Sequence, residues 1–476
     1  MSALTIAVRG DVDTLDATTR RALFARDSRC DAPRGVPRAA TENSSPDSTI
    51  RDRTAEIMQR VRERGDDALR AFAIEYDGVG GGGDSLDGAE RDSLRADRAP
   101  GDDPRGWSLE VPRAECDAAL AALDPALRRV MQRAADNIRA VHEAFRPLAS
   151  EFVTADGVRI GRRPDALQRV GVYAPGGRAA YPSSLLMGAI PARVAGVSEI
   201  IVCSPPASDG RPSPVVLAAA ALAGADRLFA VGGAGAVAAM AYGTPTIPSV
   251  DRIVGPGNAF VAEAKRQVSH EVGIDSPAGP SELLVLADDS AEPLLVAREM
   301  LAQAEHDPRA AVVLVTTSRA LARDVESKLA SGMGDAARAS TMCAALGSRG
   351  AILTATSLEA AIAFASQWAP EHLLLLVAPA ARERALVALR GCGTILHGDG
   401  ASVVFGDYMT GANHVLPTGG AGRAWSGLST QDFVRWTTWQ RVDRPAAARM
   451  AHDTAVFATA EGLDAHARAA AAWEAR

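Results

Sequence analysis

Short apolar runs alternate with longer helical runs from about residue 168 onward. The first runs read RVGVYAP, EIIVCSP, RLFAVGG and VDRIVGPG, and each ends in proline or glycine. A second series begins near residue 280 and reads ELLVLAD, AAVVLVTT, AILTAT, HLLLLV and GTILHG. Short β-branched runs separated by helices are typical of parallel βαβ units. The pattern therefore predicts an α/β protein with two doubly wound sheets, one after the other.

The regions outside these two blocks have other patterns. Residues 51–77 and 113–145 show helical periodicity, as does the alanine-rich tail from about residue 430. Residues 78–106 are rich in glycine, aspartate and arginine, so a disordered insertion is expected there. The predicted organisation is a weakly ordered lead-in (1–50), a helical region with the insertion (51–145), two Rossmann-like domains (146–278 and 279–428) and a helical C-terminal segment (429–476).

Composition narrows the class of protein. With 476 residues, of which 47% are hydrophobic, the chain is long enough for the cores of two or three domains. The net charge of −7 comes without any basic run, which argues against nucleic-acid binding. Residues 228–250 lack charges, but glycines and prolines divide them, so no membrane span is predicted. The first residues contain no apolar stretch typical of a signal peptide, and a cytoplasmic location is expected.

The cysteines favour a structural role. There are five, far apart and without a CxxC pair, so neither a disulfide framework nor a thiolate metal site is expected. Cys203 ends the run EIIVC, where a thiolate nucleophile would suit an aldehyde-oxidising enzyme. No lysine, arginine or histidine close by in the sequence would lower its pKa. Cys203 is therefore predicted to be a packed strand residue.

A glycine-rich turn offers a first candidate for cofactor binding. In VGGAGAVAA, Gly233, Gly235 and Ala238 fit the pattern G-x-G-x-x-A between a strand and a helix, and Asp251 follows 18 residues after Gly233. This pattern is typical of a dinucleotide site at a helix N-terminus. The chain has 43 glycines, however, so a chance match is also an adequate explanation.

Histidines and carboxylates in the second half offer a further candidate. Six of the eight histidines lie beyond residue 300. Gln303 and His306 are three residues apart, on one face of a predicted helix end. Imidazole and oxygen ligands suit zinc, manganese or cobalt, although the same spacing also occurs at ordinary helix ends. In WAPEHLLLL, Glu371 and His372 stand where a buried run begins, as an acid/base pair or as a polar start of a strand.

Several long motifs in order resemble the L-histidinol dehydrogenase family. They read VGVYAPGG, VGGAGAVAA, GPGNAFVAEAKRQV, GIDSPAGPSELLVLAD, LAQAEHDP, APEHL, GDYMTGANHVLPT and EGLDAH. The similarity covers roughly residues 51–470, interrupted by the insertion. It implies two incomplete Rossmann-like domains with small helical pieces from both chain ends. It also implies an intertwined homodimer, in which the C-terminal segment carrying His466 completes the partner's site.

The resemblance further implies two successive NAD-dependent oxidations, from L-histidinol through L-histidinal to L-histidine, the last step of histidine biosynthesis. It also implies one bound Zn²⁺ per subunit. The implied residues are Gln303, His306, Asp407 and His466 as zinc ligands; Glu371 and His372 as acid/base residues; Ser281, His414 and Glu461, with the metal ligands and His372, around the substrate; and Tyr173 and Asn258 against NAD.

One position departs from the family pattern. Gly235 stands where family members usually have glutamine, so a side-chain hydrogen bond near NAD is lost. Two alternatives to histidinol oxidation are oxidation of another small polar alcohol, such as a sulfonated diol, and a non-catalytic ligand-binding relative. Ser281, His414 and Glu461 favour a cationic imidazole-amine substrate, and the retained acid/base pair favours catalysis.

Overall fold

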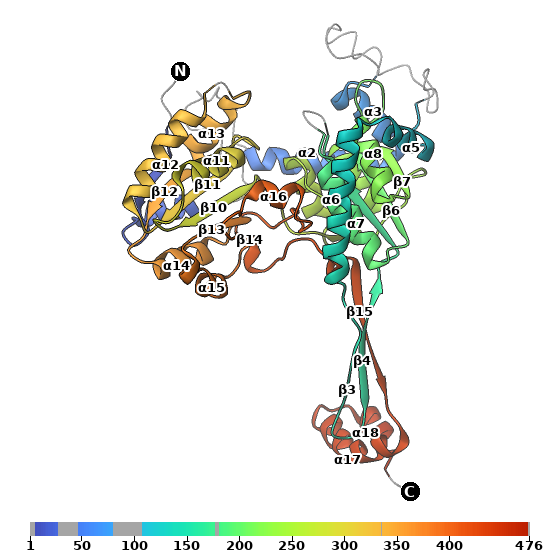
Figure 1. Ribbon diagram of the computed structural model, residues 1–476. Helices are drawn as coiled ribbons and strands as arrows, with labels where there is room; N and C mark the ends of the chain where they lie inside the picture. The colour runs from blue at the N-terminus through green and yellow to red at the C-terminus, as the bar shows by residue number, and fades with distance from the viewer. Residues whose placement is uncertain (1–4, 27–45, 80–106, 177–179, 335, 475–476) are drawn as a thin grey trace.

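The computed structural model describes residues 5–26, 46–79, 107–176, 180–334 and 336–474. Two domains, each a sheet covered by helices on both faces, stand side by side, and a narrow arm extends from one of them (Figure 1). The fold class predicted from the sequence, two successive doubly wound α/β domains, is confirmed.

The first domain is built on a six-stranded sheet in the order β2-β7-β6-β5-β8-β9. Only β2 runs antiparallel to its neighbour, and β5 pairs in parallel with both β6 and β8. Helices α5 to α8 cover one face and α2, α3, α9 and α10 the other. Alternation along β5 places Val172 in one core and Tyr173 in the other, as expected for a sheet buried on both faces. The elements are β2 (Glu110–Val111), β5 (Arg169–Tyr173), β6 (Glu199–Ser204), β7 (Arg227–Ala230), β8 (Arg252–Val254), β9 (Gly273–Ile274), α2 (Pro46–Arg64), α3 (Asp66–Asp77), α5 (Arg113–Ala122), α6 (Pro125–Ala144), α7 (Pro182–Ala195), α8 (Pro214–Ala223), α9 (Gly233–Tyr242) and α10 (Ala259–Val268).

The second domain is built on a parallel sheet in the order β1-β12-β11-β10-β13-β14. Its central strand β10 has every residue buried, with Leu283 and Val285 in one core and Leu284 and Leu286 in the other. The elements are β1 (Val8–Asp11), β10 (Glu282–Ala287), β11 (Ala311–Thr316), β12 (Gly350–Thr354), β13 (His372–Leu376), β14 (Thr394–His397), α1 (Ala17–Phe24), α11 (Pro293–Ala304), α12 (Arg319–Gly332), α13 (Ala339–Arg349), α14 (Leu358–Trp368), α15 (Pro379–Ala388) and α16 (Val403–Tyr408).

The N-terminal segment differs from the weakly ordered lead-in that was expected. Within residues 5–26, β1 pairs with β12 at the edge of the second sheet, and α1 buries Leu23 against the same domain. Pairing of β1 satisfies the backbone groups that an open edge of β12 would leave exposed. Residues 5–26 therefore belong to the domain that is otherwise built from the second half of the chain. The predicted insertion falls almost wholly on residues 80–106, outside the described residues, and the predicted domain boundaries stay a prediction.

The arm consists of β3 (Ser150–Val153), β4 (Arg159–Ala166), β15 (Val434–Arg441), α17 (Arg444–Ala460) and α18 (Asp464–Ala471). The three strands form an antiparallel sheet in the order β15-β4-β3, and the two helices lie at its far end (Figure 1). A helix was expected from about residue 430, but residues 434–441 form β15. Its sequence VRWTTWQR is rich in β-branched and aromatic residues, and Trp439 packs opposite Gly161 of β4.

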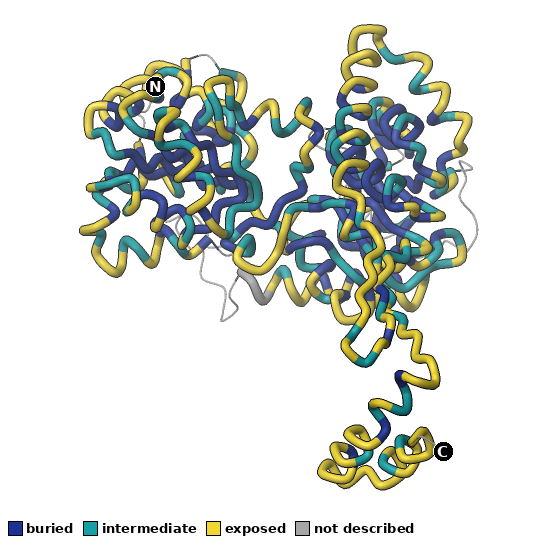
Figure 2. The backbone as a smooth tube through the Cα atoms, turned by 60° about the horizontal axis from the view of Figure 1, so that its bottom comes forward, coloured by how far each residue is buried: buried dark blue, intermediate teal, exposed yellow. Residues whose placement is uncertain are grey.

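Most of the arm is solvent-exposed, in contrast to the buried sheets of the two domains (Figure 2). Two short 3-10 helices, η1 (Ala421–Arg423) and η2 (Thr430–Phe433), precede β15. Across the part of the chain that the structure describes, no helix is both long enough and apolar enough to cross a membrane.

Candidate active site

The two proposed acid/base residues lie where the second sheet changes its direction of winding. Strands β11 and β12 follow on one side of β10, and β13 and β14 on the other. Glu282 is the first residue of β10 and His372 the first of β13, with Glu371 directly before it. Open α/β sheets usually bind ligands at the carboxyl ends of the strands at such a switch point. Here the polar residues gather at the amino ends instead.

One residue, Glu282, holds both proposed acid/base side chains through its main chain. The Glu282 amide N–H donates to Glu371 Oε2 over 2.7 Å. Its carbonyl oxygen, 3.1 Å from His372 Nδ1, can only accept, so Nδ1 carries the proton and donates it. His372 Nδ1 also lies 3.5 Å from Glu371 Oε2. Both side chains are buried. The carboxylate and the imidazole are thus fixed side by side, with the imidazole Nε2 pointing away from β10.

The far side of the His372 ring faces Asp407 of α16. His372 Nε2 is 3.6 Å from Asp407 Oδ1, and His414 Nδ1 donates to the Asp407 carbonyl oxygen over 2.8 Å. Burial by itself lowers the pKa of His372, but the Glu371 and Asp407 carboxylates outweigh it and raise that pKa to about 10. Burial raises the pKa of Asp407, but the nearby His372, His414 and His306 outweigh it and lower that pKa. The site therefore stabilises a proton on the His372 ring.

The end of α11 brings Gln303 and His306 to the same region. Gln303 is buried, and its Nε2 has no hydrogen-bond partner among the described residues. His306 is exposed and close enough to Asp407 to lower its pKa. Glu299 of α11 fixes α16 in place, because its carboxylate accepts from Ser402 Oγ over 2.6 Å and from the Val403 amide over 2.9 Å. Ser281 directly precedes β10 and so lies beside this group.

The structure does not bring the two C-terminal site residues to this group within one chain. Glu461 ends α17 and His466 lies on α18, both at the far end of the arm (Figure 1). Within the described residues, no cluster of three or more histidine, cysteine, aspartate or glutamate side chains is arranged to hold a metal. Gln303, His306 and Asp407 nevertheless offer an amide oxygen, an imidazole and a carboxylate, which are donor types that could hold zinc together with a fourth ligand.

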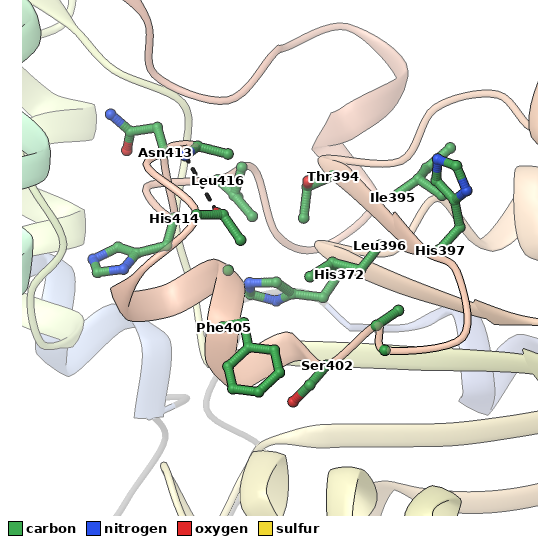
Figure 3. A pocket seen from close by; sticks show the side chains of 15 residues that line it. His372, Thr394, Ile395, Leu396, His397, Ser402, Phe405, Asn413, His414 and Leu416 are labelled. Carbon is green, nitrogen blue, oxygen red and sulfur yellow. Dashed lines mark hydrogen bonds between the residues drawn. The ribbon is translucent and has the colours of Figure 1, made fainter. Parts of the chain in front are cut away.

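A cavity of about 390 Å³ opens beside His372. Strand β14, helix α16 and the loop that carries His414 line it. Figure 3 shows the His372 ring next to α16, with His414 and His397 on opposite sides of it. This space is large enough for a small polar molecule to approach His372.

The two predicted cofactor residues lie at the carboxyl ends of β5 and β8, the switch point of the first sheet. The Tyr173 hydroxyl accepts from the Gly233 amide over 3.1 Å, and burial raises the pKa of Tyr173 to about 12. Asn258 caps α10, since its Oδ1 accepts from the amides of Phe260 and Val261. The sequence prediction that both residues contact NAD stays a prediction.

Residues of the glycine-rich turn, and Asp251, contact other parts of the first domain. The Gly233 amide at the start of α9 is already bonded to Tyr173. The Asp251 carboxylate accepts from the amides of Gln168 and Arg169, both at 2.9 Å, and so caps the start of β5. A Cβ added at Gly235 would lie 3.3 Å from Leu69 Cδ2 of α3, so this position faces a packed helix.

Cys203 has the structural role that the sequence predicted. It is fully buried in β6, and burial raises the pKa of its thiol to about 12. A thiol with such a pKa stays protonated near neutral pH and is a poor nucleophile.

Two residues that support the site were not identified from the sequence: Glu282 and Glu299. Glu282 had a signal, because it is the one charged residue in the buried run ELLVLA. Glu299 acts on a segment far from it in sequence, and nothing in the local pattern distinguishes it from a surface residue.

The fold and the site together define a two-domain Rossmann-like α/β protein. Its buried carboxylate–imidazole pair lies at the amino-terminal ends of inner strands of the second sheet. A model of the family described as histidinol dehydrogenase matches residues 40–473. The chain belongs to this family.

Known relatives agree over nearly the whole length. The histidinol dehydrogenase of Methanosarcina barkeri is 42% identical over 414 residues, which cover 87% of this chain and 89% of that protein. The histidinol dehydrogenase of Halobacterium salinarum is 43% identical over 449 residues, which cover 94% and 95%. The crystal structure of histidinol dehydrogenase from Elizabethkingia anophelis is similar with a TM-score of 0.84 and 28% identity, covering 99% of both chains.

Proposed function

We propose that this chain is a zinc-dependent oxidoreductase that converts L-histidinol through L-histidinal to L-histidine in two successive NAD-dependent oxidations, the last step of histidine biosynthesis. Membership of the histidinol dehydrogenase family supports the substrate and the pathway. The observation that carries the chemistry is the buried Glu371–His372 pair, held by one residue and facing Asp407.

His372 is the base of the first step. Alcohol oxidation removes a proton from the hydroxyl oxygen while a hydride leaves the carbon for the nicotinamide ring. Because Nδ1–H is donated to the Glu282 carbonyl oxygen, the neutral ring has its free lone pair on Nε2. Without a metal, the Glu371 and Asp407 carboxylates favour the protonated ring. Zinc held by Asp407 would offset that carboxylate and favour the neutral ring, which can accept the hydroxyl proton. This arrangement suits proton transfer from the substrate hydroxyl.

Glu371 is the base of the second step. The aldehyde adds water to give its hydrate, which then loses a hydride to a second NAD and ends as the carboxylate. Glu371 has one oxygen bound to the Glu282 amide and a second oxygen that can take a proton from water. The hydrate supplies the second oxygen of the product, so no thiol ester is needed. The buried Cys203 is consistent with that route.

Gln303, His306 and Asp407 of one chain would hold zinc, with His466 supplied by a second copy. With zinc there, the imidazole and amine of histidinol would be donors to the metal, which would orient the alcohol carbon. Ser281, His414 and Glu461 would contact the substrate, and Tyr173 and Asn258 would lie against NAD.

A homodimer with shared active sites is part of this proposal. His466 and Glu461 lie on the arm, away from the other site residues. The arm also exposes large apolar side chains, among them Phe152 at 67% and Phe457 at 70%. Such side chains are typical of surfaces that another chain covers. A second copy that receives the arm would bury them and complete the donor set.

An assay with the purified full chain tests the proposal. L-Histidinol and NAD should give two NADH for each histidine formed, and removal of zinc by a chelator should stop the reaction. If the protein reduces NAD with a sulfonated diol and leaves histidinol unchanged, the proposed substrate is wrong. If chelation leaves turnover unchanged, the proposed metal dependence is wrong.

A further inference from the structure

Arg26, just after α1, reaches into the region of the acid/base pair. Its Nη1 donates to Glu282 Oε2 over 2.7 Å, and only 4% and 3% of the two side chains are exposed. Glu282 Oε1 in turn accepts from the Gly419 amide over 2.8 Å. Both oxygens of this carboxylate are therefore bound, and the start of β10 is tied to the N-terminal segment.

Arg26 also contacts the segment that leads into Glu371. Its Nη2 donates to the carbonyl oxygen of Trp368, the last residue of α14, and its guanidinium lies 3.5 Å from the centre of the Trp368 ring. The Trp368 indole donates back to the carbonyl oxygen of Leu23 in α1 over 3.0 Å. The next residue, Ala369, has a φ of +52°, a conformation that non-glycine residues adopt only when the surrounding contacts hold it.

The two contacts converge on the same pair of side chains. Glu282 holds Glu371 and His372 through its amide and carbonyl groups, and the turn from Trp368 delivers Glu371 to that amide. One guanidinium thus links the start of β10 to the end of α14, from which the turn leads to Glu371 and His372. A planar guanidinium can make both bonds at once, whereas the single nitrogen of lysine cannot reproduce this geometry.

We propose that Arg26 is a positioning residue for the Glu371–His372 pair, acting through Glu282 and through the Trp368 turn. The expected effect on kcat rests on the proposed function. The positioning of Glu371 and His372 by Arg26 does not depend on the identity of the substrate. The N-terminal segment is thereby part of the active-site architecture as well as an edge strand of the sheet.

The test compares Arg26→Met, Arg26→Lys and a matched control, Arg9→Met, in the zinc-loaded protein. Arg9 lies on the same segment in β1 and pairs with Glu326 over 2.8 Å, but this ion pair is exposed and remote from β10. Arg26→Met should lower kcat for histidinol roughly 10- to 100-fold, with KM changed by less than about threefold. Arg26→Lys should give an intermediate kcat, and Arg9→Met should match the wild type.

A double-mutant cycle separates positioning from simple stabilisation. Glu371→Gln removes one member of the pair, so adding Arg26→Met to it should cost much less than in the wild-type background. An equal loss in both backgrounds, or a normal kcat with only a lower yield of folded protein, would overturn the proposal. If Arg26→Met does not fold, Arg26→Lys decides: a normal kcat would refute the positioning role.

Hydrogen exchange gives a readout that does not need turnover. The amide of Glu282, which donates to Glu371, should exchange faster in Arg26→Met than in the wild type and in Arg9→Met. If the wild type fails to oxidise histidinol, the proposed function is wrong and the exchange result still decides the role of Arg26. Unchanged exchange at residue 282 would show that Arg26 does not hold this group.

Discussion

Gly255 follows β8 at the switch point of the first sheet, where the backbone of Tyr173 leaves no room for a side chain, and Gly255→Ala tests what this close packing does. Gly255 has a φ of +113°, and an added Cβ would lie 2.2 Å from the carbonyl oxygen of Tyr173. Carbon and oxygen atoms that are not bonded rarely approach closer than about 3 Å, so the turn would have to move by nearly 1 Å.

The surrounding contacts oppose that movement. The Gly255 amide donates to Asp275 Oδ2 over 2.7 Å, and its carbonyl oxygen accepts from Lys265 Nζ over 3.0 Å. Lys265 and Asp275 are buried and form an ion pair with each other. The displacement would therefore pass along the turn to Asn258, or across to Tyr173, the two residues proposed to lie against NAD.

We expect Gly255→Ala to raise the KM for NAD about 10- to 100-fold, because a misplacement near 1 Å in a binding site costs up to about 100-fold. The KM for histidinol should change little, since the residues proposed to bind the substrate lie in the second domain and on the arm, away from this turn. Steady-state kinetics with each substrate varied separately measures both values. Gly224→Ala is the control: Gly224 has a φ of +72°, but no atom lies within 4 Å of its added Cβ.

An unchanged KM for NAD in Gly255→Ala would refute this reasoning, because it would place the cofactor away from the turn. A similar rise in both KM values would also contradict it, since the perturbation would then be global. Gly224→Ala should show only a loss of about 1–2 kcal/mol in the free energy of unfolding, from the strained backbone.

Three further predictions follow from the site and the core. Glu371→Gln keeps an oxygen for the Glu282 amide but cannot take up a proton, so histidinal oxidation should slow by about 100-fold or more and the alcohol step much less. Equal losses in single-turnover assays of both steps would refute the assignment of Glu371 as the base of the second step. His466→Ala should abolish zinc binding and turnover, and coexpression with Glu371→Gln should restore up to about a quarter of the activity through mixed dimers; no restoration would contradict shared sites. His142 of α6 is buried with neither ring nitrogen bonded among the described residues, and burial lowers its pKa to about 4. Because the unfolded chain takes up this proton more readily, the free energy of unfolding should fall by about 3 kcal/mol as pH drops from 6.5 to 4. His142→Leu should lose that dependence in urea titrations, and an unchanged pH profile would show that His142 is not the cause.

Much of the fold was predictable because it depends on local patterns. Apolar runs such as ELLVLAD and HLLLLV are strands in the structure, and the helices between them cover both faces of parallel sheets. The start of β13 at His372 was also visible in the sequence as two ionisable residues before a buried run. Local hydrophobic periodicity decides these features, and it is present in the chain itself.

The pairing of distant segments was not predictable in the same way. β1 joins a sheet whose other strands begin at residue 282, and β15 pairs with β4 across more than 260 residues. A helix was expected around β15 because its neighbours in sequence are helical. Strand pairing depends on which edge is available in the folded protein, and a single sequence does not report that.

The sequence by itself determined the residue types of this protein: two apolar blocks that must be buried, and a set of imidazoles, carboxylates and an amide with a common chemistry. Only the tertiary structure decided that the acid/base pair lies at the amino-terminal ends of the strands of its sheet, that Glu282 and Arg26 hold the pair, and that His466 lies on a separate arm. The physical reason is the separation in sequence between the residues that interact. Hydrophobic and helical periodicity is set by residues near one another in sequence, whereas these contacts join residues 89 to 256 positions apart, and their geometry exists only after the sheets have formed.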